Sequence, residues 1–200
     1  MAPIRAFRRA IAGTFALSAV VAVTACGGPT EIKANQQTIA ATLTVHALNG
    51  SSPSLPSALV LAGSPAVIRM TTDYQFDLAM DFDESGAARL IPVDRVASPA
   101  VLSPSRRVGL QKVTGTFDSI TRAPNGNYVT RADLPIAVGD VGVIESLNHP
   151  YCANIFYVTQ NIYAKFVVEA IDPAARSVRL RLVVDPNCGF RGLETGTPSR

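Results

Sequence analysis

Alternation of apolar and polar side chains is the feature that most limits how this chain can fold. From residue 74 to residue 83 an apolar side chain stands at every second position, at Tyr74, Phe76, Leu78, Met80 and Phe82. A period of two places successive side chains on opposite faces of a β-strand, whereas a helical face repeats every 3.6 residues. The segment is therefore predicted to be a strand with one apolar face and one face that carries carboxylates.

A second alternating segment lies near the C-terminal end. Four aliphatic side chains alternate with two arginines and a valine over residues 178–184, and residues 162–171 before them are rich in β-branched and aromatic side chains. The sequence Asp172-Pro173-Ala174-Ala175 supplies a turn between the two segments,. A hairpin is predicted here, and another is predicted where a turn at 84–86 joins the strand at 74–83 to residues 88–96.

The rest of the chain also favours short strands. Residues rich in turn chemistry separate further candidate strands at 38–48, 57–61, 66–71, 108–120, 128–131, 138–145 and 155–159,. With 14 glycines and 14 prolines dispersed along the chain, no stretch of 12 residues after the N-terminal segment has convincing helical periodicity. We expect an all-β fold, an antiparallel β-sandwich of the immunoglobulin-like or a similar type, with a small β-barrel as the alternative.

The N-terminal segment has the anatomy of an export signal. Arg5, Arg8 and Arg9 precede an apolar run of 16 residues at 10–25,. The sequence Val23-Thr24-Ala25-Cys26 at its end resembles the lipobox of bacterial lipoproteins. The resemblance implies removal of residues 1–25 and attachment of a lipid to Cys26. The alternatives are ordinary secretory cleavage after Ala25 and an uncleaved membrane helix, for which the run is short of the roughly 20 residues needed.

The resemblance, together with the pattern and composition of the rest of the chain, implies a domain organisation and a location. Residues 1–25 are expected to be the signal peptide, 26–37 the lipidated N-terminus and a tether, 38–190 a single β-rich domain and 191–200 a flexible tail,. The protein is then exported and anchored to a bacterial membrane through its lipid. Gly27 stands where many inner-membrane lipoproteins carry aspartate, which favours the outer membrane or the cell surface.

Charge and cysteine content agree with export. The chain has 18 basic and 15 acidic residues, and because three arginines and no acidic residue lie in 1–25, the remainder is balanced at 15 each. The basic character therefore gives no reason to expect a nucleic-acid partner. If Cys26 carries a lipid, Cys152 and Cys188 are left as a pair in an oxidising compartment, and we expect a disulfide between them.

One turn resembles half of a calcium-binding loop. Asp81, Asp83 and Ser85 stand at positions one, three and five, and Gly86 stands at six,. Position twelve is Pro92 where a bidentate glutamate is required, and the flanks read as strands,. An ordinary hairpin turn with solvated carboxylates is favoured, and weak calcium binding is the alternative.

The sequence offers little for catalysis. The two histidines are His46, on the polar face of its predicted strand, and His149, in a turn beside Cys152. No Gly-x-Ser-x-Gly, HExxH, Walker or dinucleotide motif is present,. Carboxylate pairs for glycoside chemistry are conceivable at Asp77 with Asp81 and at Asp133 with Asp140,. An aromatic ligand surface is conceivable where four rings follow one another at Tyr151, Phe156, Tyr157 and Tyr163.

We therefore expect a non-catalytic binding or scaffolding module of the cell envelope, without a cofactor. Its partners would be the membrane, through the lipid, and an envelope protein, a glycan or a small ligand. The alternatives are a hydrolase that uses Asp and Glu residues, which requires a deep pocket with perturbed ionisable groups, and a small barrel that encloses an apolar ligand.

Overall fold

The computed structural model describes residues 33–70, 73–97, 101–102, 106–153 and 159–198. The strands are β1 (Ile39–His46), β2 (Ala58–Val60), β3 (Ala66–Ile68), β4 (Leu78–Phe82), β5 (Ala88–Pro92), β6 (Arg107–Lys112), β7 (Val129–Thr130), β8 (Leu134–Pro135), β9 (Val141–Leu147), β10 (Ile162–Asp172) and β11 (Ser177–Asp185). The helical elements are short: α1 (Val93–Val96) and the 3₁₀ turns η1 (Phe117–Ser119) and η2 (Pro150–Cys152).

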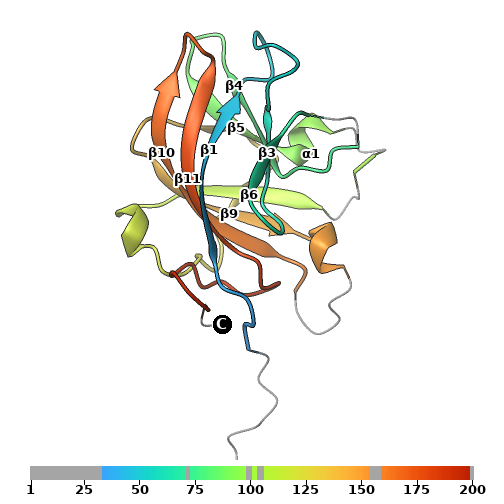
Figure 1. The fold of residues 1–200 in the computed structure, drawn as a ribbon, viewed down its shortest axis with the longest axis vertical. Coiled ribbons are helices and arrows are strands. Elements are labelled where there is room, and N and C mark those ends of the chain that lie inside the picture. The colour runs from blue at the N-terminus through green and yellow to red at the C-terminus, as the bar shows by residue number, and fades with distance from the viewer. Residues whose placement is uncertain (1–32, 71–72, 98–100, 103–105, 154–158, 199–200) are drawn as a thin grey trace, which may run out of the picture. The chain divides into compact units, whose positions relative to one another are not determined.

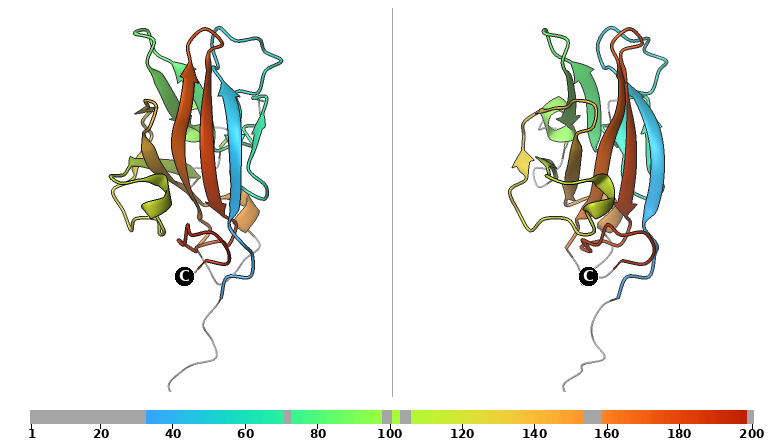
Figure 2. Two further views of the ribbon diagram at one scale, coloured as in Figure 1. Left: turned by 60° about the vertical axis from the view of Figure 1, so that its left-hand side comes forward. Right: turned by 90° about the vertical axis from the view of Figure 1, so that its left-hand side faces the viewer.

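Two antiparallel sheets form a β-sandwich. The larger sheet has the strand order β1-β11-β10-β9-β6-β7, and the smaller has the order β3-β2-β4-β5-β8. Figure 1 shows the course of the chain, and Figure 2 shows the long strands β1, β10 and β11 side by side in one layer. The all-β prediction and the sandwich are confirmed. Among the described strands each sheet ends in two edge strands, so a closed barrel is not formed.

Both predicted hairpins are present. In the first, β4 pairs with β5 from Leu78 opposite Pro92 to Phe82 opposite Ala88. In the second, β10 pairs with β11, with a bulge between Val168 and Ala170. The alternation predicted for β11 is confirmed, because the apolar side chains on one face of the strand are buried in the core between the sheets: Val178, Leu180, Leu182 and Val184.

A second apolar layer covers the outer face of the larger sheet. Phe117 of η1 is buried there against Val141 and Val183. The cationic groups of Lys165 and Arg181 lie 4.7 and 4.3 Å from the centroid of the Phe117 ring. This layer explains why the predicted strand 108–120 is too long: β6 ends at Lys112, and the chain then turns over the sheet.

The predicted flexible tail at 191–200 is wrong for its first part. The Leu193 side chain is completely buried, and its N–H donates to the Thr121 carbonyl oxygen at 2.7 Å. Further on, the Gly196 carbonyl accepts from the Thr38 N–H at 2.8 Å. Burial of an apolar side chain and pairing of the backbone fix this segment, although its composition is that of a loop.

Three other predicted boundaries are also corrected. The tether at 26–37 is fixed near its end, because the N–H groups of Asn35 and Gln36 both donate to Asn187 Oδ1 at 3.0 Å. The strand predicted at 74–83 begins only at Leu78, and Tyr74 has a left-handed φ of 51°. The strand predicted at 88–96 ends at Pro92, and α1 begins at the next residue, Val93. The strand predicted at 155–159 lies almost wholly outside the described residues.

Candidate functional site

Three turns of the domain converge at one end of the sandwich, which we call the loop end. They are the exit of β1 at 47–50, the β4–β5 turn at 83–87 and the β10–β11 turn at 173–176 (Figure 1). Backbone hydrogen bonds join them: the Ala47 N–H donates to the Arg176 carbonyl at 2.8 Å, and the Leu48 N–H donates to the Met80 carbonyl at 2.9 Å. The loop end is therefore a connected unit.

Arg176 holds these turns together through its side chain. Its Nε donates to the Asn49 carbonyl at 2.8 Å, and its guanidinium lies 3.4 Å from Asp81 Oδ1 and 5.0 Å from the centroid of the Phe82 ring. Asp81 is almost fully buried, and its Oδ2 accepts from the Asn49 side-chain amide at 2.5 Å. Arg176, in the β10–β11 turn, thus contacts Asn49 at the exit of β1 and Asp81 and Phe82 of β4.

The β4–β5 turn is built around Asp83. Its Oδ1 accepts from the Ser85 N–H at 2.9 Å, the Ser85 hydroxyl at 2.6 Å and the Ala87 N–H at 3.0 Å. Gly86 has a φ of +82°, a conformation that glycine adopts without steric cost,. The hydrogen bonds, that from the Ser85 hydroxyl above all, lower the pKa of Asp83 and keep it ionised,.

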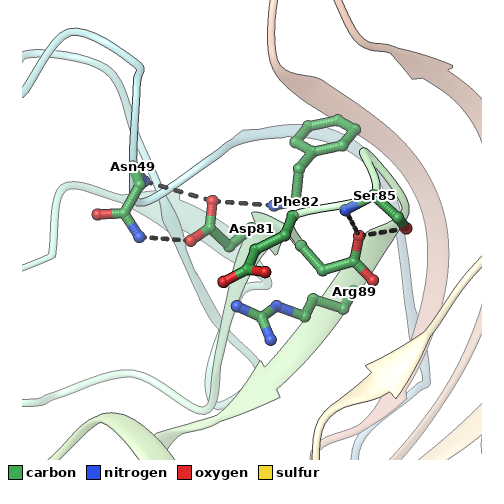
Figure 3. A pocket seen from close by; sticks show the side chains of 7 residues that line it. Asn49, Asp81, Phe82, Ser85 and Arg89 are labelled. Atoms are coloured by element: carbon green, nitrogen blue, oxygen red, sulfur yellow. Dashed lines mark hydrogen bonds between the residues drawn. The ribbon is translucent and has the colours of Figure 1, made fainter.

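A polar pocket opens between the exit of β1 and the β4–β5 turn (Figure 3). Its volume is about 510 Å³. It is lined by Asn49, Asp81, Phe82, Asp83, Glu84, Ser85 and Arg89. The lining combines hydrogen-bond acceptors on three carboxylates with donors on an amide, a hydroxyl and a guanidinium. Such a mixture suits a ligand that both donates and accepts hydrogen bonds, and the excess of carboxylates disfavours anions.

The three residues of the predicted calcium loop do not converge on one point. Asp83 and Ser85 contact each other, but Asp81 uses both of its carboxylate oxygens toward Asn49, Phe82 and Arg176. Within the described ranges there is no group of three or more His, Cys, Asp or Glu side chains that could hold a metal ion. At these positions the structure shows the end of β4, at Asp81, and the hairpin turn, at Asp83 and Ser85.

A second cluster of ionisable groups lies inside the sandwich, just before β4. Asp77 is completely buried, and its Oδ1 accepts from the Ser146 hydroxyl at 2.7 Å while its Oδ2 accepts from the Leu61 N–H at 2.8 Å. Arg106 and His149, both about 95% buried, approach the same Oδ1 to 3.5 and 3.2 Å. Arg106 also donates to the carbonyl oxygens of residues 74 and 76. We call these four side chains the Asp77 cluster.

The Asp77 cluster is arranged for support, not for proton relay. Burial alone would raise the pKa of Asp77, but the contact with His149, the charge of Arg106 and the hydrogen bond from Ser146 together lower it,. His149 Nδ1 accepts from the Tyr151 N–H at 3.1 Å, so its Nε2 carries the proton and faces Asp77,. Because Ser146 bonds to the carboxylate and not to the imidazole, these residues lack the order of a nucleophile, base and acid.

The predicted disulfide between Cys152 and Cys188 is present, and both cysteines are buried. Cys152 ends η2, which begins after its N-cap His149, so the bridge holds the His149 turn against the segment that follows β11. The prediction that His149 lies in a turn beside a disulfide is confirmed. Its contact with Asp77, 72 residues away in the sequence, has no local sequence signal.

Asp185 is the last residue of β11, three residues before Cys188 of the disulfide. Its Oδ1 accepts from the backbone and the side-chain amide of Asn187, both at 2.8 Å, while its buried Oδ2 has no hydrogen-bond partner among the described residues. Burial raises the pKa of Asp185 to about 6, although the Asn187 hydrogen bonds oppose the shift. Below pH 3.8, the pKa of this carboxyl in the unfolded chain, it is protonated in both states and its burial costs no charge. Above about pH 6 the buried carboxylate is charged, and the full cost of that charge lowers the stability of the fold at neutral pH,.

The candidate carboxylate pairs do not flank a common cleft. Asp77 lies in the interior and Asp81 at the loop end, as described above. Asp133 pairs with Arg89 and Arg95 at 3.0 and 3.4 Å, and Asp140 pairs with Lys112 at 2.6 Å. Each carboxylate is thus used in a separate contact, which does not fit two groups acting on one sugar.

The candidate aromatic surface is only partly described. Phe156 and Tyr157 lie outside the described residues. Tyr163 is buried on the outer face of β10, where its hydroxyl donates to Glu145 at 2.7 Å, whereas Tyr151 is exposed on η2. Burial first, and then the neighbouring Glu145, raise the pKa of Tyr163 to about 12, against the hydrogen bond from Asn161. Its hydroxyl therefore stays protonated at neutral pH.

Comparison with protein-family models, with curated proteins and with solved structures gave no match for this chain. No helix in the described ranges is long and apolar enough to cross a membrane.

Proposed function

We propose that this chain is an exported, lipid-anchored binding module of the bacterial cell envelope that takes a hydroxyl-rich ligand of the glycan class at its loop end. The observation that carries the proposal is the pocket of about 510 Å³ with three carboxylates, an amide, a hydroxyl and a guanidinium on its lining. Sugar hydroxyls can donate to a carboxylate such as that of the exposed Glu84 and accept from a guanidinium such as that of Arg89, so this lining offers partners for both functions,.

The course of β1 supports anchoring at the N-terminal side. The described chain begins at Lys33, and β1 then runs for eight residues to the loop end (Figure 1). A strand of that length spans about 27 Å. A lipid on Cys26, seven residues before Lys33, would thus tether the domain through the end from which β1 starts. The buried disulfide agrees with an oxidising compartment outside the cytoplasm,.

The absence of catalytic order in the two ionisable clusters supports binding over hydrolysis. The loop-end pocket is lined by carboxylates without histidine or cysteine. The Asp77 cluster contains serine, aspartate and histidine, but Ser146 and Asp77 are completely buried. A substrate cannot reach either group without opening the core.

The ligand class is tested by calorimetric titration of the full chain, in detergent, with soluble envelope glycan fragments. Glu84 lines the pocket from the exposed β4–β5 turn, and removal of its side chain by Glu84→Ala is expected to weaken binding about tenfold, the loss of a charged hydrogen-bonding group,. The matched control is Glu169→Ala, which removes a carboxylate from the outer face of β10. Equal affinity of both variants, or binding of anionic ligands only, would contradict the proposal.

Anchoring is tested separately by Cys26→Ser. We expect the variant to leave the membrane fraction or to accumulate as uncleaved precursor, because serine has no thiol for lipid attachment. Metabolic labelling with a fatty acid, followed by fractionation, measures the result, and Cys152→Ala with Cys188→Ala in the same chain is the control that keeps Cys26. Labelled Cys26→Ser protein would refute the anchor and leave the binding proposal untouched.

A further inference from the structure

The β1 edge of the larger sheet differs from the other three sheet edges of the described domain. β7 and β8 have two residues each and β3 has three. Such short edges limit pairing with other chains. β1 has eight residues, Ile39 to His46, with neither a proline nor a Lys, Arg, Asp or Glu among them. Proteins usually protect a long edge with those residue types, and no other described strand pairs with the outer side of β1, so within the described residues this edge is left open for pairing,.

The backbone groups available on β1 can be identified from its neighbours. The N–H of Ala47 points toward the β11 side, where it donates to Arg176, whereas the N–H groups of Thr38 and His46 point to the opposite side. Thr38 donates there to the Gly196 carbonyl and His46 to the Pro56 carbonyl, both at 2.8 Å. Because these directions alternate along a strand, Ala40, Thr42 and Thr44 direct their N–H and C=O groups to the open edge.

The inward side chains show that the sandwich is not closed along this edge. Ile39, Ala41 and Leu43 face the smaller sheet, yet each is only partly buried, whereas Val45 at the end of the strand is buried. All three residues of β3, the nearest edge of the smaller sheet, are partly exposed as well. An added strand beside β1 would cover this apolar margin.

We propose that β1 is a homodimer interface in which two copies of this chain pair their β1 strands antiparallel about a two-fold axis at Thr42. Thr38 and His46, whose outward N–H groups already bond within the chain, lie four residues to either side of Thr42. The stretch between them that is open for pairing, residues 40–44, is therefore centred on Thr42. The two-fold operation pairs residues 40–44 of the two copies, with Thr42 opposite Thr42 and Ala40 opposite Thr44, and the covered positions Thr38 and His46 limit the pairing to this stretch,.

Charge favours a second copy as the occupant. No side chain of β1 from Ile39 to Val45 is charged, so the pairing brings no like charges together,. On the outer face, Thr42 and Thr44 are opposite Arg181 and Arg179 of β11, and both arginines pair with Glu169. The threonines of the two copies meet as a cross-strand pair, which is favourable in sheets.

Cysteine cross-linking tests the register. In hydrogen-bonded antiparallel pairs opposite Cα atoms are about 5.5 Å apart, within the range for a disulfide. With Cys26→Ser in every variant and diamide as oxidant, Thr42→Cys is expected to give covalent dimers of the full chain. In the Ala40→Cys variant alone, the two thiol positions of a dimer lie at least about 13 Å apart and no covalent dimer is expected, but Ala40→Cys cross-links when mixed with Thr44→Cys. Cross-linking of Ala40→Cys alone to the extent of Thr42→Cys would overturn the proposal.

Sedimentation equilibrium tests the interface without a new thiol. The full chain in detergent is expected to dimerise, and Thr42→Lys, which sets two ammonium groups opposite each other on an exposed site, raises the dissociation constant roughly tenfold or more. Val138→Lys is the control, because Val138 is 62% exposed and lies outside every strand. A monomeric parent chain, a Val138→Lys effect equal to that of Thr42→Lys, or binding of β1 to a different protein only would overturn the proposal.

Discussion

Replacement of Asp77 by alanine is expected to lower the free energy of unfolding by about 3–5 kcal/mol, the cost of breaking a buried ion pair from one side. The carboxylate is completely buried and receives hydrogen bonds from Ser146 and the Leu61 N–H. Arg106, only 5% exposed, would keep its charge in the core without the carboxylate it faces. Urea unfolding, followed by circular dichroism, measures the change.

The control for Asp77 is Asp133→Ala. Asp133 contacts two basic side chains, Arg89 and Arg95, but its ion pairs are partly open to solvent, and such pairs contribute about 0–1 kcal/mol,. A loss at Asp77 that does not exceed the loss at Asp133 would show that the Asp77 cluster does not support the fold.

The lowered pKa of Asp77 also gives its stabilising effect a pH dependence. The folded value lies below the unfolded value of 3.8, so the native state holds fewer protons on this group than the unfolded chain does,. The contribution is complete above the unfolded value and is lost as pH falls through the folded value. Below pH 3.8 the free energy of unfolding of the parent chain should thus fall more steeply with decreasing pH than that of Asp77→Ala,.

The strands could be predicted from the sequence because their evidence is local. Alternation over 178–184 and the turn at 172–175 define β10 and β11 without reference to the rest of the chain,. The same pattern gives a wrong prediction for Asp77, because alternation places that side chain on the polar, exposed face of a strand. The backbone is not yet in a strand there, and Arg106 and His149 provide the partners that make burial of the carboxylate tolerable,.

Contacts between distant segments account for the other misses. Arg176, Arg106 and Ser146 have no motif, and their roles depend on partners 29 to 127 residues away. Leu193 belongs to a segment with the composition of a tail, and only the apolar outer face of β9 and β10 gives it a place to be buried. A glutamate at 84 beside a turn likewise gives no signal of a pocket until the exit of β1 lies next to it. Local periodicity specifies elements, whereas sites arise from the packing of those elements.

Removal of the disulfide is expected to have the second large effect. Cys152→Ala with Cys188→Ala opens a loop of 36 residues, which by chain entropy lowers the free energy of unfolding by about 3–4 kcal/mol,. The denaturant m-value should rise, because the unfolded chain without the bridge exposes more surface. Urea unfolding under oxidising conditions measures both quantities, and Cys26→Ser is the control that leaves the bridge intact. A change below about 1 kcal/mol would contradict the entropic argument.

The disulfide and the Asp77 cluster should also be coupled, because η2 carries Cys152 in the bridge and its N-cap His149 contacts Asp77. Once the bridge is lost, the His149 turn is held less firmly, and part of the Asp77 interaction is already weakened. The triple variant with Asp77→Ala should therefore lose less stability than the sum of the two separate losses, by about 0.5–3 kcal/mol. Strict additivity would show that the bridge stabilises the fold through the unfolded chain alone and does not position His149.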